Sequence, residues 1–265
     1  MTASNTSPAA LHKPLRGSLL SAAAIAGLLA GLVTAGFHAV ATEPIIDRAV
    51  AIEEASHADH QEDVGHAEEV VSRPTQKIGL WFGWGSLGLT WGVMTAAALL
   101  LAARLLEFDI TTRARLLAGA AGFWVFAGVP ALKYPANPPG VGNPDTINER
   151  TRLFFGLGGV TLIAVLVAAL VVVLLARRGR PVWLGVAAGL AIVVAVALGS
   201  VLLLPDVIEE SVVPADLIAE FQRYSIAGAL VFWVAFAAIF TAWPRLRERL
   251  AGRGAKARLN AAEAQ

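Results

Sequence analysis

The chain has 265 residues, of which 56% are hydrophobic and only 15% are charged, whereas about a quarter of the residues in a soluble protein are charged. A soluble protein of this length could not bury so much apolar surface in one core, so we expect lipid to surround most of the chain. Cysteine is absent, which excludes disulfides, thiolate metal sites and cysteine nucleophiles. The net charge of +1 gives no indication of a nucleic-acid partner, and none is expected.

Six apolar runs are each long enough to cross a bilayer as a helix, which takes about 20 residues. These runs are continuous and do not alternate with polar residues, which excludes a membrane β-barrel. The predicted fold class is therefore all-α, a polytopic membrane helix bundle with six transmembrane helices. The predicted spans are Gly17–Thr42, Gly79–Ala103, Leu116–Leu132, Leu153–Ala176, Val182–Leu204 and Tyr224–Trp243.

The distribution of lysine and arginine predicts the orientation of the bundle. Most basic residues fall in the connections on one side, and most acidic residues fall on the other side. The positive-inside rule places the basic side in the cytoplasm, so both termini are predicted to be cytoplasmic. The basic residues on that side are Lys13, Arg16, Arg104, Arg113, Arg115, Arg177, Arg178, Arg180, Arg245, Arg247, Arg249, Arg253, Lys256 and Arg258.

The predicted organisation has three parts. Residues 1–16 form a cytoplasmic segment, residues 17–243 form the transmembrane bundle, and residues 244–265 form a basic cytoplasmic tail. The bundle includes an external acidic and histidine-bearing segment, 43–78, and an external proline-rich loop, 133–151. We expect the tail to face solvent or lipid headgroups and to be disordered toward its end.

The first span also has features of a secretory signal peptide. Lys13 and Arg16 precede the apolar stretch, and Ala39–Ala41 resembles a small-residue cleavage site. The apolar stretch Leu19–Phe37 is longer than the 7–15 residues typical of a signal peptide. We therefore expect a retained anchor, whereas cleavage would leave five spans.

Short patterns predict local structure at several points. In the external segment, Pro44 suits a kink or the first turn of a helix, and the apolar residues that follow have helical spacing: Ile45, Ala49, Ile52 and Ala55. Thr146 and Glu149 have the spacing of a capping box at the start of the fourth span. Glycines at four-residue spacing predict close contacts between helices; the three pairs are Gly27/Gly31, Gly79/Gly83 and Gly88/Gly92.

His38 is the candidate metal ligand inside the membrane, because it is the only histidine in any predicted span and ionisable residues in spans commonly mark function. A pair of histidines for haem is therefore not available in the bundle. Glu43 and Asp47 follow His38 at the outer end of the same span, one helical turn apart. A neutral imidazole with carboxylates suits borderline divalent ions such as Co²⁺, Ni²⁺ or Zn²⁺. We predict that these three residues bind a metal ion.

Three further histidines, His57, His60 and His66, lie among carboxylates in the external segment. Such a cluster would concentrate cations at the outer mouth, and we include all three among the candidate metal ligands. The alternative is that the acidic segment is simply solvated and that His38 hydrogen-bonds a neighbouring helix.

The proline-rich loop contributes a second group of candidate residues, Lys133, Tyr134 and Asn137. Its prolines stiffen the chain into turns. The loop is either a rigid connection between the third and fourth spans or the lining of a permeation mouth. Sequence alone supports both interpretations.

Two motifs resemble a known family. They are Gly31-x4-Gly36-Phe37-His38-x4-Glu43-Pro44 and the segment Lys133-Tyr134-Pro135-Ala136-Asn137-Pro138-Pro139-x-Val141-Gly142, with weaker matches at Thr146-x4-Thr151 and Phe221-x2-Tyr224-Ser225. The chain resembles the CbtA family of predicted cobalt transporter subunits from about Leu15 to Trp243.

The resemblance implies a non-enzymatic subunit of the bacterial inner membrane that imports cobalt together with a small histidine-bearing membrane subunit. It also implies an association with cobalamin biosynthesis, and it suggests about five spans where hydropathy predicts six.

Two classes of function follow from these expectations. The first is a component of a divalent metal uptake system, with Co²⁺ or Ni²⁺ as the expected cargo, whose external histidine and carboxylate cluster captures the ion. The second is a non-transporting membrane scaffold or regulatory partner of another permease. No resident cofactor is expected, the lipid bilayer is the expected surrounding, and a homo-oligomer is compatible with the sequence. A membrane enzyme ranks third, because the sequence shows no nucleophile–base pair and no catalytic metal motif.

Overall fold

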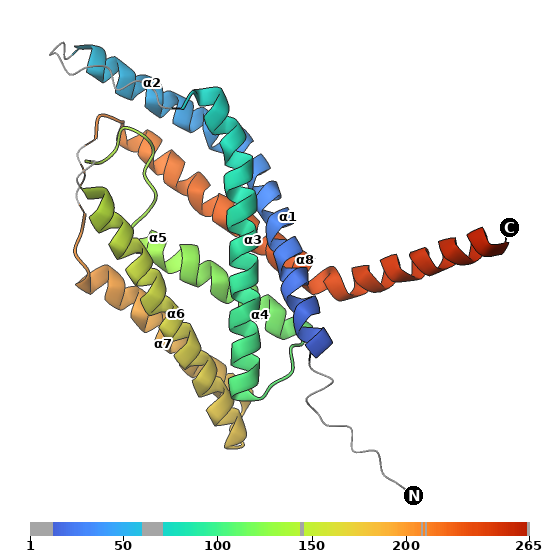
Figure 1. The fold of residues 1–265 in the computed structure, drawn as a ribbon. Helices are drawn as coiled ribbons and strands as arrows, with labels where there is room; N and C mark the ends of the chain where they lie inside the picture. Colours follow the sequence, from blue (N-terminus) through green and yellow to red (C-terminus); the bar gives the residue numbers. More distant parts are fainter. Residues whose placement is uncertain (1–12, 60–70, 144–145, 208, 210, 264–265) are drawn as a thin grey trace, which may run out of the picture.

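The computed structural model describes residues 13–59, 71–143, 146–207, 209 and 211–263, and these residues are almost entirely helical. Eight α-helices and one π-helical turn follow one another in this part of the chain (Figure 1). They are α1 (Lys13–Ala41), α2 (Glu43–Asp59), α3 (Arg73–Leu106), α4 (Thr112–Phe123), η1 (Trp124–Gly128), α5 (Val129–Lys133), α6 (Ile147–Arg177), α7 (Val182–Leu203) and α8 (Ala215–Glu263).

Six helical segments are long and apolar enough to cross a membrane, which confirms the predicted fold class and the number of spans. Five of them lie within single helices, and the third is made of α4, η1 and α5 together. The spans are Ser18–Ala41, Arg73–Leu106, Thr112–Lys133, Ile147–Arg177, Val182–Leu203 and Ala215–Pro244.

The third span is interrupted where the sequence predicted a single run. The π-helical turn η1 ends at Gly128, and Pro130, the second residue of α5, has no backbone N–H to donate to the preceding turn. A π-helical turn widens the helix locally, so this span departs from a regular α-helix between α4 and α5. At the other end of this span, the Thr111 hydroxyl accepts a hydrogen bond from the Ala114 N–H and caps α4.

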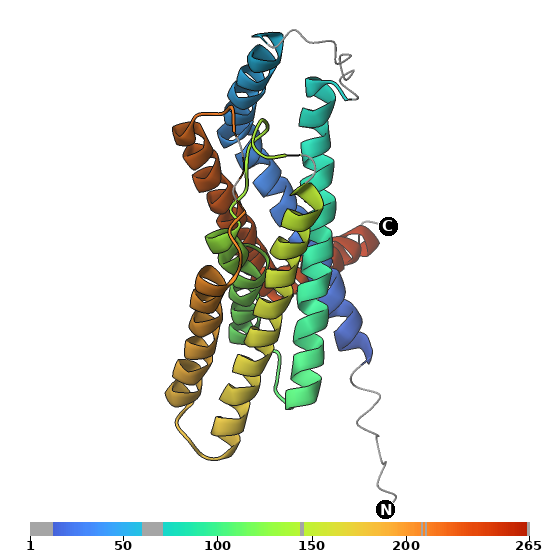
Figure 2. The same ribbon diagram turned by 90° about the vertical axis from the view of Figure 1, so that its left-hand side faces the viewer.

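The span ends alternate between two ends of the molecule, as successive crossings require. The start of α1, the end of α3 and the α6–α7 connection lie toward one end, whereas α2 and the starts of α3 and α6 lie toward the other (Figure 2). We call the end that carries α2 the outer end. The cytoplasmic placement of both termini remains a prediction.

Glycines bring α1 and α3 into backbone contact. A Cβ atom added at Gly27 would lie 2.1 Å from the carbonyl oxygen of Gly88, and one added at Gly92 would lie 2.3 Å from that of Ala23. No side chain fits at these positions, so the first and third predicted glycine pairs make the contacts expected of them. A Cβ atom at Gly79 or Gly83, the second pair, would meet nothing within 4 Å, and the predicted contact there is absent.

The buried core lies between α1, α3, α4 and α8. Its largest members are aromatic side chains of α8, namely Phe232, Trp233, Phe236 and Phe240. The α6–α7 hairpin packs chiefly on itself, and its apolar surface is largely exposed (Figure 2). Because lipid is as apolar as a leucine side chain, such exposure has little cost within a bilayer.

Two local predictions differ from the structure. Thr146 precedes α6 as predicted, but its hydroxyl makes no capping bond to the helix; it donates to the Asn143 carbonyl and contacts the Glu209 carboxylate. The predicted capping box is therefore wrong, because a tertiary partner competes for the hydroxyl. The tail beyond Pro244 is helical as far as Glu263, where disorder was expected.

Candidate functional site

His38 lies in the last turn of α1, where α1, α3 and α8 meet. Its side chain is buried, with 7% of its surface exposed. The ring stacks on Trp84 of α3 at a centroid separation of 4.9 Å, and its Nδ1 is 2.7 Å from the hydroxyl oxygen of Thr42. Two contacts of different kinds therefore fix the orientation of this imidazole.

The second ring nitrogen of His38, Nε2, is buried and has no hydrogen-bond partner among the described residues. It faces the backbone of α8, because a Cβ atom at Gly228 would lie only 2.3 Å from it. Glycine at this position lets the imidazole fit between the helices. A buried nitrogen without a partner is costly in a folded protein, which marks His38 as an unusual residue of this core.

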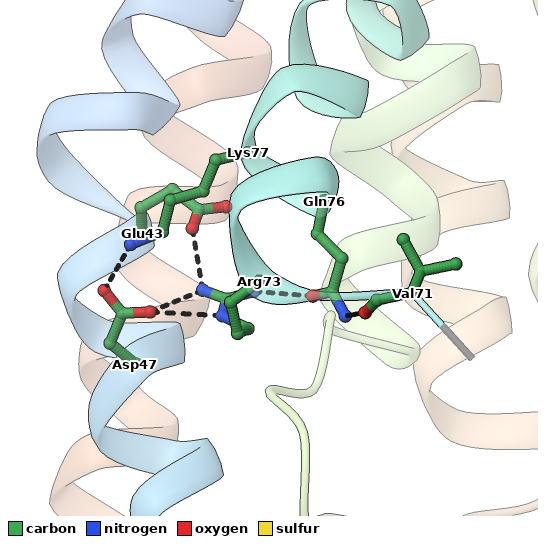
Figure 3. A network of polar contacts seen from close by, with 6 residues as sticks. All are labelled: Glu43, Asp47, Val71, Arg73, Gln76 and Lys77. Carbon is green, nitrogen blue, oxygen red and sulfur yellow. Dashed lines mark hydrogen bonds and ion pairs between the residues drawn. The ribbon is translucent and has the colours of Figure 1, made fainter. Parts of the chain in front are cut away.

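Glu43 and Asp47 lie at the start of α2, as predicted, and both form ion pairs with α3. One guanidinium nitrogen of Arg73, Nη2, lies 2.8 Å from Glu43 Oε2 and 2.6 Å from Asp47 Oδ1 (Figure 3). Lys77 binds the other oxygen of Asp47 at 2.8 Å, and Gln76 accepts a hydrogen bond from Arg73. Figure 3 shows this outer ion-pair network, which links the start of α2 to the start of α3.

The network explains the electrostatics of Asp47. Hydrogen bonds from Lys77 and from Arg73 stabilise the charged form and hold the pKa of the Asp47 carboxyl below its usual value. Glu43 is the more buried of the two acids, with its residue 8% exposed. The cations of the network were missed at the level of sequence. Their four-residue spacing, which matches that of Glu43 and Asp47, is the signal that could have indicated the pairing.

The structure thus brings only part of the predicted metal ligand set together. In the described part of the chain, no group of three or more histidine and acidic side chains is arranged to hold a metal ion. Glu43 and Asp47 face Arg73, and His38 faces Gly228. His60 and His66 lie outside the described residues, and so does the side chain of His57, although its backbone belongs to α2. Their role as metal ligands remains a prediction.

The proline-rich loop is tied to the connection between α7 and α8. The Lys133 ammonium, whose side chain is only 6% exposed, pairs with Asp206 and donates to the Val201 carbonyl. The Tyr134 hydroxyl donates to the Pro205 carbonyl at 3.1 Å. Asn137 is half-buried within the same loop. These contacts suit the interpretation of the loop as a rigid connection.

Glu209 reinforces this junction. Its carboxylate accepts a hydrogen bond from the Asn143 N–H at 2.9 Å and pairs with Arg150 at 3.2 Å. Burial by itself raises the pKa of the Glu209 carboxyl, but the Asn143 N–H, the Thr146 hydroxyl and the Arg150 charge together hold that pKa below its usual value. Hydrogen bonds and ion pairs therefore join the proline-rich loop to the connection between α7 and α8.

An unbroken series of ring contacts runs from His38 into the bundle. Trp84 contacts Trp91, Trp91 contacts Phe232 at 5.3 Å, and the series continues along α8 through Phe236 to Phe240. Arg115 of α4 lies over the Phe240 ring at 5.2 Å, at the far end of the series. Aromatic rings thus fill the space between α1, α3, α4 and α8. Trp84 is partly buried against this core.

The six apolar helices with polar networks confined to their ends define a multi-pass helical membrane protein. A family model described as "Probable cobalt transporter subunit (CbtA)" matches residues 17–244. The chain therefore belongs to the CbtA family, a family of transporter subunits, and the resemblance seen in its motifs is confirmed. No curated protein and no solved structure matches the chain.

Proposed function

We propose that this chain is the membrane-embedded subunit of a cobalt uptake system and that its outer end captures the ion. The observation that carries the proposal is the buried His38 imidazole, one helical turn before the start of α2, whose Nε2 has no partner among the described residues. Ni²⁺ is the closest alternative cargo, because imidazole and carboxylate ligands suit both ions. Glu43 and Asp47 are the proposed carboxylate ligands, and His57, His60 and His66 are proposed to gather ions from solution.

The hydrogen bond between His38 and Thr42 supports a role for the imidazole as a ligand. When Nδ1 carries the proton and donates it to the Thr42 hydroxyl, Nε2 keeps its lone pair free for a metal ion. A hydrogen bond to the second nitrogen commonly orients metal-binding histidines in this way. The ring edge faces Gly228, so an ion reaches Nε2 only when α8 moves away from α1.

Arg73 is the residue that an arriving ion has to displace. Its Nη2 lies between the carboxylates of Glu43 and Asp47, which is the place a bridging divalent cation would take. We propose that Arg73 and Lys77 neutralise the buried Glu43 and the exposed Asp47 until cobalt replaces the two cations. A buried carboxylate without a partner destabilises the folded protein. Replacing Arg73 directly by the ion therefore has a smaller free-energy cost than removing Arg73 first.

The remaining features of the system are also proposals. The word "subunit" in the family description implies further components, and we propose a small histidine-bearing membrane subunit as one of them. We further propose that the protein resides in the bacterial inner membrane with both termini in the cytoplasm. The proposed activity is transport without catalysis, and the imported cobalt would supply cobalamin biosynthesis.

Cobalt uptake by cells that carry the complete system tests the site. We expect His38→Ala and Glu43→Gln to lower uptake at least tenfold with little loss of folded protein, because water replaces a ligand poorly. His12→Ala is the matched histidine control. Glu220→Gln is the matched carboxylate control, because Glu220 also pairs with an arginine, Arg48, at 2.7 Å. Unchanged uptake in both site variants would contradict the assignment.

Replacing Arg73 separates ion exchange from simple structural support. If Arg73 competes with the ion, Arg73→Gln should lower the cobalt concentration for half-maximal uptake about fivefold, the equivalent of about 1 kcal/mol for an ion pair of this exposure. If Arg73 only holds α2 against α3, uptake and the amount of folded protein should fall together. The second result would remove Arg73 from the proposed mechanism.

One observation favours the alternative that the chain is a scaffold or regulatory partner of another permease. The aromatic series from Trp84 to Phe240 fills the centre of the bundle, so an ion would have to pass at its edge or between subunits. Cobalt flux into proteoliposomes containing this chain alone separates the two functions. Flux above that of empty liposomes supports a transporter. Flux that appears only with another subunit, and that His38→Ala in this chain leaves unchanged, supports the alternative.

A further inference from the structure

The sixth span ends at a proline that lies inside a longer helix. Pro244 is within α8, which continues from the end of the span to Glu263. Proline has no backbone N–H, so the carbonyl four residues earlier loses the hydrogen bond that a regular helix would give it. In α8 that carbonyl belongs to Phe240. Figure 1 shows α8 changing direction toward its C-terminal part, as expected of a helix with an internal proline.

Arg115 of α4 supplies the hydrogen bond that Pro244 cannot make. Its Nη1 donates to the Phe240 carbonyl oxygen at 3.2 Å, and its guanidinium carbon lies 5.2 Å from the centre of the Phe240 ring. In the described part of the chain, no carboxylate forms an ion pair with Arg115. The partners of this half-buried cation are therefore a carbonyl dipole and an aromatic face.

The helices α4 and α8 cross closely next to this contact. A Cβ atom added at Gly119 would lie 2.9 Å from the Cβ atom of Ala237, and one added at Gly122 would lie 2.2 Å from the ring of Trp233. Successive turns of α4 thus contact successive turns of α8, and the two glycines let the helices approach each other. The crossing fixes the place about which α8 would tilt.

The contacts of α8 have a fixed order along its axis. The Arg115 contact lies on the inner side of the crossing with α4, and the contact between Gly228 and His38 lies on the outer side. Gly228 is about 18 Å from Phe240 along the helix, at a rise of about 1.5 Å per residue. A rigid helix that tilts about the crossing moves its two ends in opposite directions. Holding the inner end against α4 therefore also holds the outer end against α1.

We propose that the hydrogen bond and ring contact between Arg115 and Phe240, which we call the inner latch, control whether α8 covers His38. While the latch is formed, α8 lies against α1 and Gly228 covers Nε2. When the latch breaks, the Phe240 carbonyl loses its donor, the bend at Pro244 becomes flexible, and α8 tilts away from α1.

The purpose of this movement rests on the proposed function, because tilting of α8 is the step that would admit an ion to His38. The latch itself does not depend on the cargo. Its test uses no cobalt, so the latch can fail while uptake still depends on His38, and it can hold where uptake does not.

Two features suit a contact that breaks and forms again. The distance of 3.2 Å between Nη1 and the carbonyl oxygen is at the long end of the hydrogen-bond range. The Nε of Arg115 is buried and has no hydrogen-bond partner among the described residues, so the guanidinium is only partly satisfied in this position. A bidentate pair between arginine and a carboxylate would hold the two helices more strongly.

A double-variant cycle in the full chain tests whether Arg115 acts through the carbonyl that Pro244 frees. Arg115→Met should lower the melting temperature in nanodiscs by about 2–6 °C, because a buried carbonyl loses its donor. Pro244→Ala supplies an N–H to the same carbonyl, so Arg115→Met should lower the melting temperature less than half as much in that background. Arg113→Met, at an exposed position of the same helix, is the matched control.

Equal losses from Arg115→Met in the two backgrounds would overturn the proposal. If Arg115→Met alone does not fold, Pro244→Ala should restore folded protein, and failure to restore it would overturn the proposal as well.

Distances between spin labels test the movement of α8. The chain has no cysteine, so labels can be placed at Val40→Cys on α1 and Ile226→Cys on α8, both at exposed positions. We expect Arg115→Met to add a population that is longer by several ångströms, and Pro244→Ala to remove it. The control pair is Val33→Cys on α1 with Phe82→Cys on α3, also exposed, whose distance should stay the same.

An unchanged distance between α1 and α8 in Arg115→Met would show that the latch does not hold α8. A longer distance that Pro244→Ala leaves in place, or one that the control pair shares, would reflect general loosening of the bundle and would equally overturn the proposal.

Discussion

At the scale of single residues, the contact between His38 and Gly228 leaves no room for a side chain on α8. Glycine usually weakens a helix relative to alanine, by about 1 kcal/mol, so Gly228→Ala should stabilise α8 if space allowed it. The added Cβ would lie 2.3 Å from Nε2, and the imidazole would have to leave Trp84. A residue-level steric conflict thus outweighs helix propensity.

We therefore predict that Gly228→Ala lowers the free energy of unfolding by about 1–3 kcal/mol, the usual cost of overpacking a core. The measurement is thermal unfolding in detergent, together with cobalt uptake, which should fall with the displaced ring. Gly156→Ala is the matched control, because a Cβ there meets nothing within 4 Å. Equal effects of the two variants would show that the His38 ring adjusts freely.

Asp47 predicts how the outer ion-pair network responds to acid. Hydrogen bonds from Lys77 and Arg73 hold its pKa below the ordinary value of 3.8. The unfolded chain therefore binds the proton more readily, and the stabilisation is fully present above that ordinary value. It is lost as the pH falls through the lower pKa of the folded state.

The expected result is that the melting temperature of the purified protein declines below about pH 4, as paired carboxylates protonate. Asp47→Asn should melt at a lower temperature than the unsubstituted chain near neutral pH. The two curves should converge in acid, where Asp47 is protonated in both states. A constant difference between the curves at every pH would mean that the charge of Asp47 contributes nothing.

At the scale of helices, the crossing of α1 and α3 depends on the absence of side chains. The added Cβ at Gly27 would lie 2.1 Å from a backbone oxygen, which cannot move aside as a flexible side chain can. Gly83, on another face of α3, borders open space. Glycines at four-residue spacing therefore make a close helix contact at Gly27 but none at Gly83.

Gly27→Ile should separate α1 from α3 and cost at least about 1–3 kcal/mol, whereas Gly83→Ile should change stability by less than about 0.5 kcal/mol. The yield of monodisperse protein and its melting temperature measure both effects. If Gly83→Ile proves as damaging as Gly27→Ile, the exposed face of α3 must pack against something in the membrane.

At the scale of the whole molecule, six spans bring the chain back to the side on which α1 begins, opposite α2. The charge distribution predicts that the basic tail, residues 244–265, is cytoplasmic. A reporter fused after Gln265 should behave as cytoplasmic, and one inserted in the external segment, 43–78, should behave as external. The reverse pattern of activity would overturn the orientation, and a mixed pattern would indicate that one span does not cross.

Much of the architecture was accessible from the sequence, because the bilayer imposes its requirements locally. Every backbone group in hydrocarbon must be paired within its own helix, so a continuous apolar run identifies a span without reference to its neighbours. The same locality explains the correct start of α2 beside Pro44 and the position of His38 near the outer end of α1. Most predicted spans were shorter than the helices of the structure, because helices continue into the polar region at their ends; the fifth, Val182–Leu204, ends one residue beyond α7.

The identity of the partners was decided only by the tertiary structure. Arg73 meets Glu43 and Asp47, and His38 faces Gly228, because particular helix faces meet at particular heights. The sequence next to these residues does not specify how far each helix is rotated about its axis or how it is shifted along the bundle. Spacing alone therefore suggested a metal site, whereas the folded chain has an ion-pair network there. The close crossing of α1 and α3 is equally non-local, since glycine pairs with the same spacing face a helix at Gly88 and open space at Gly83.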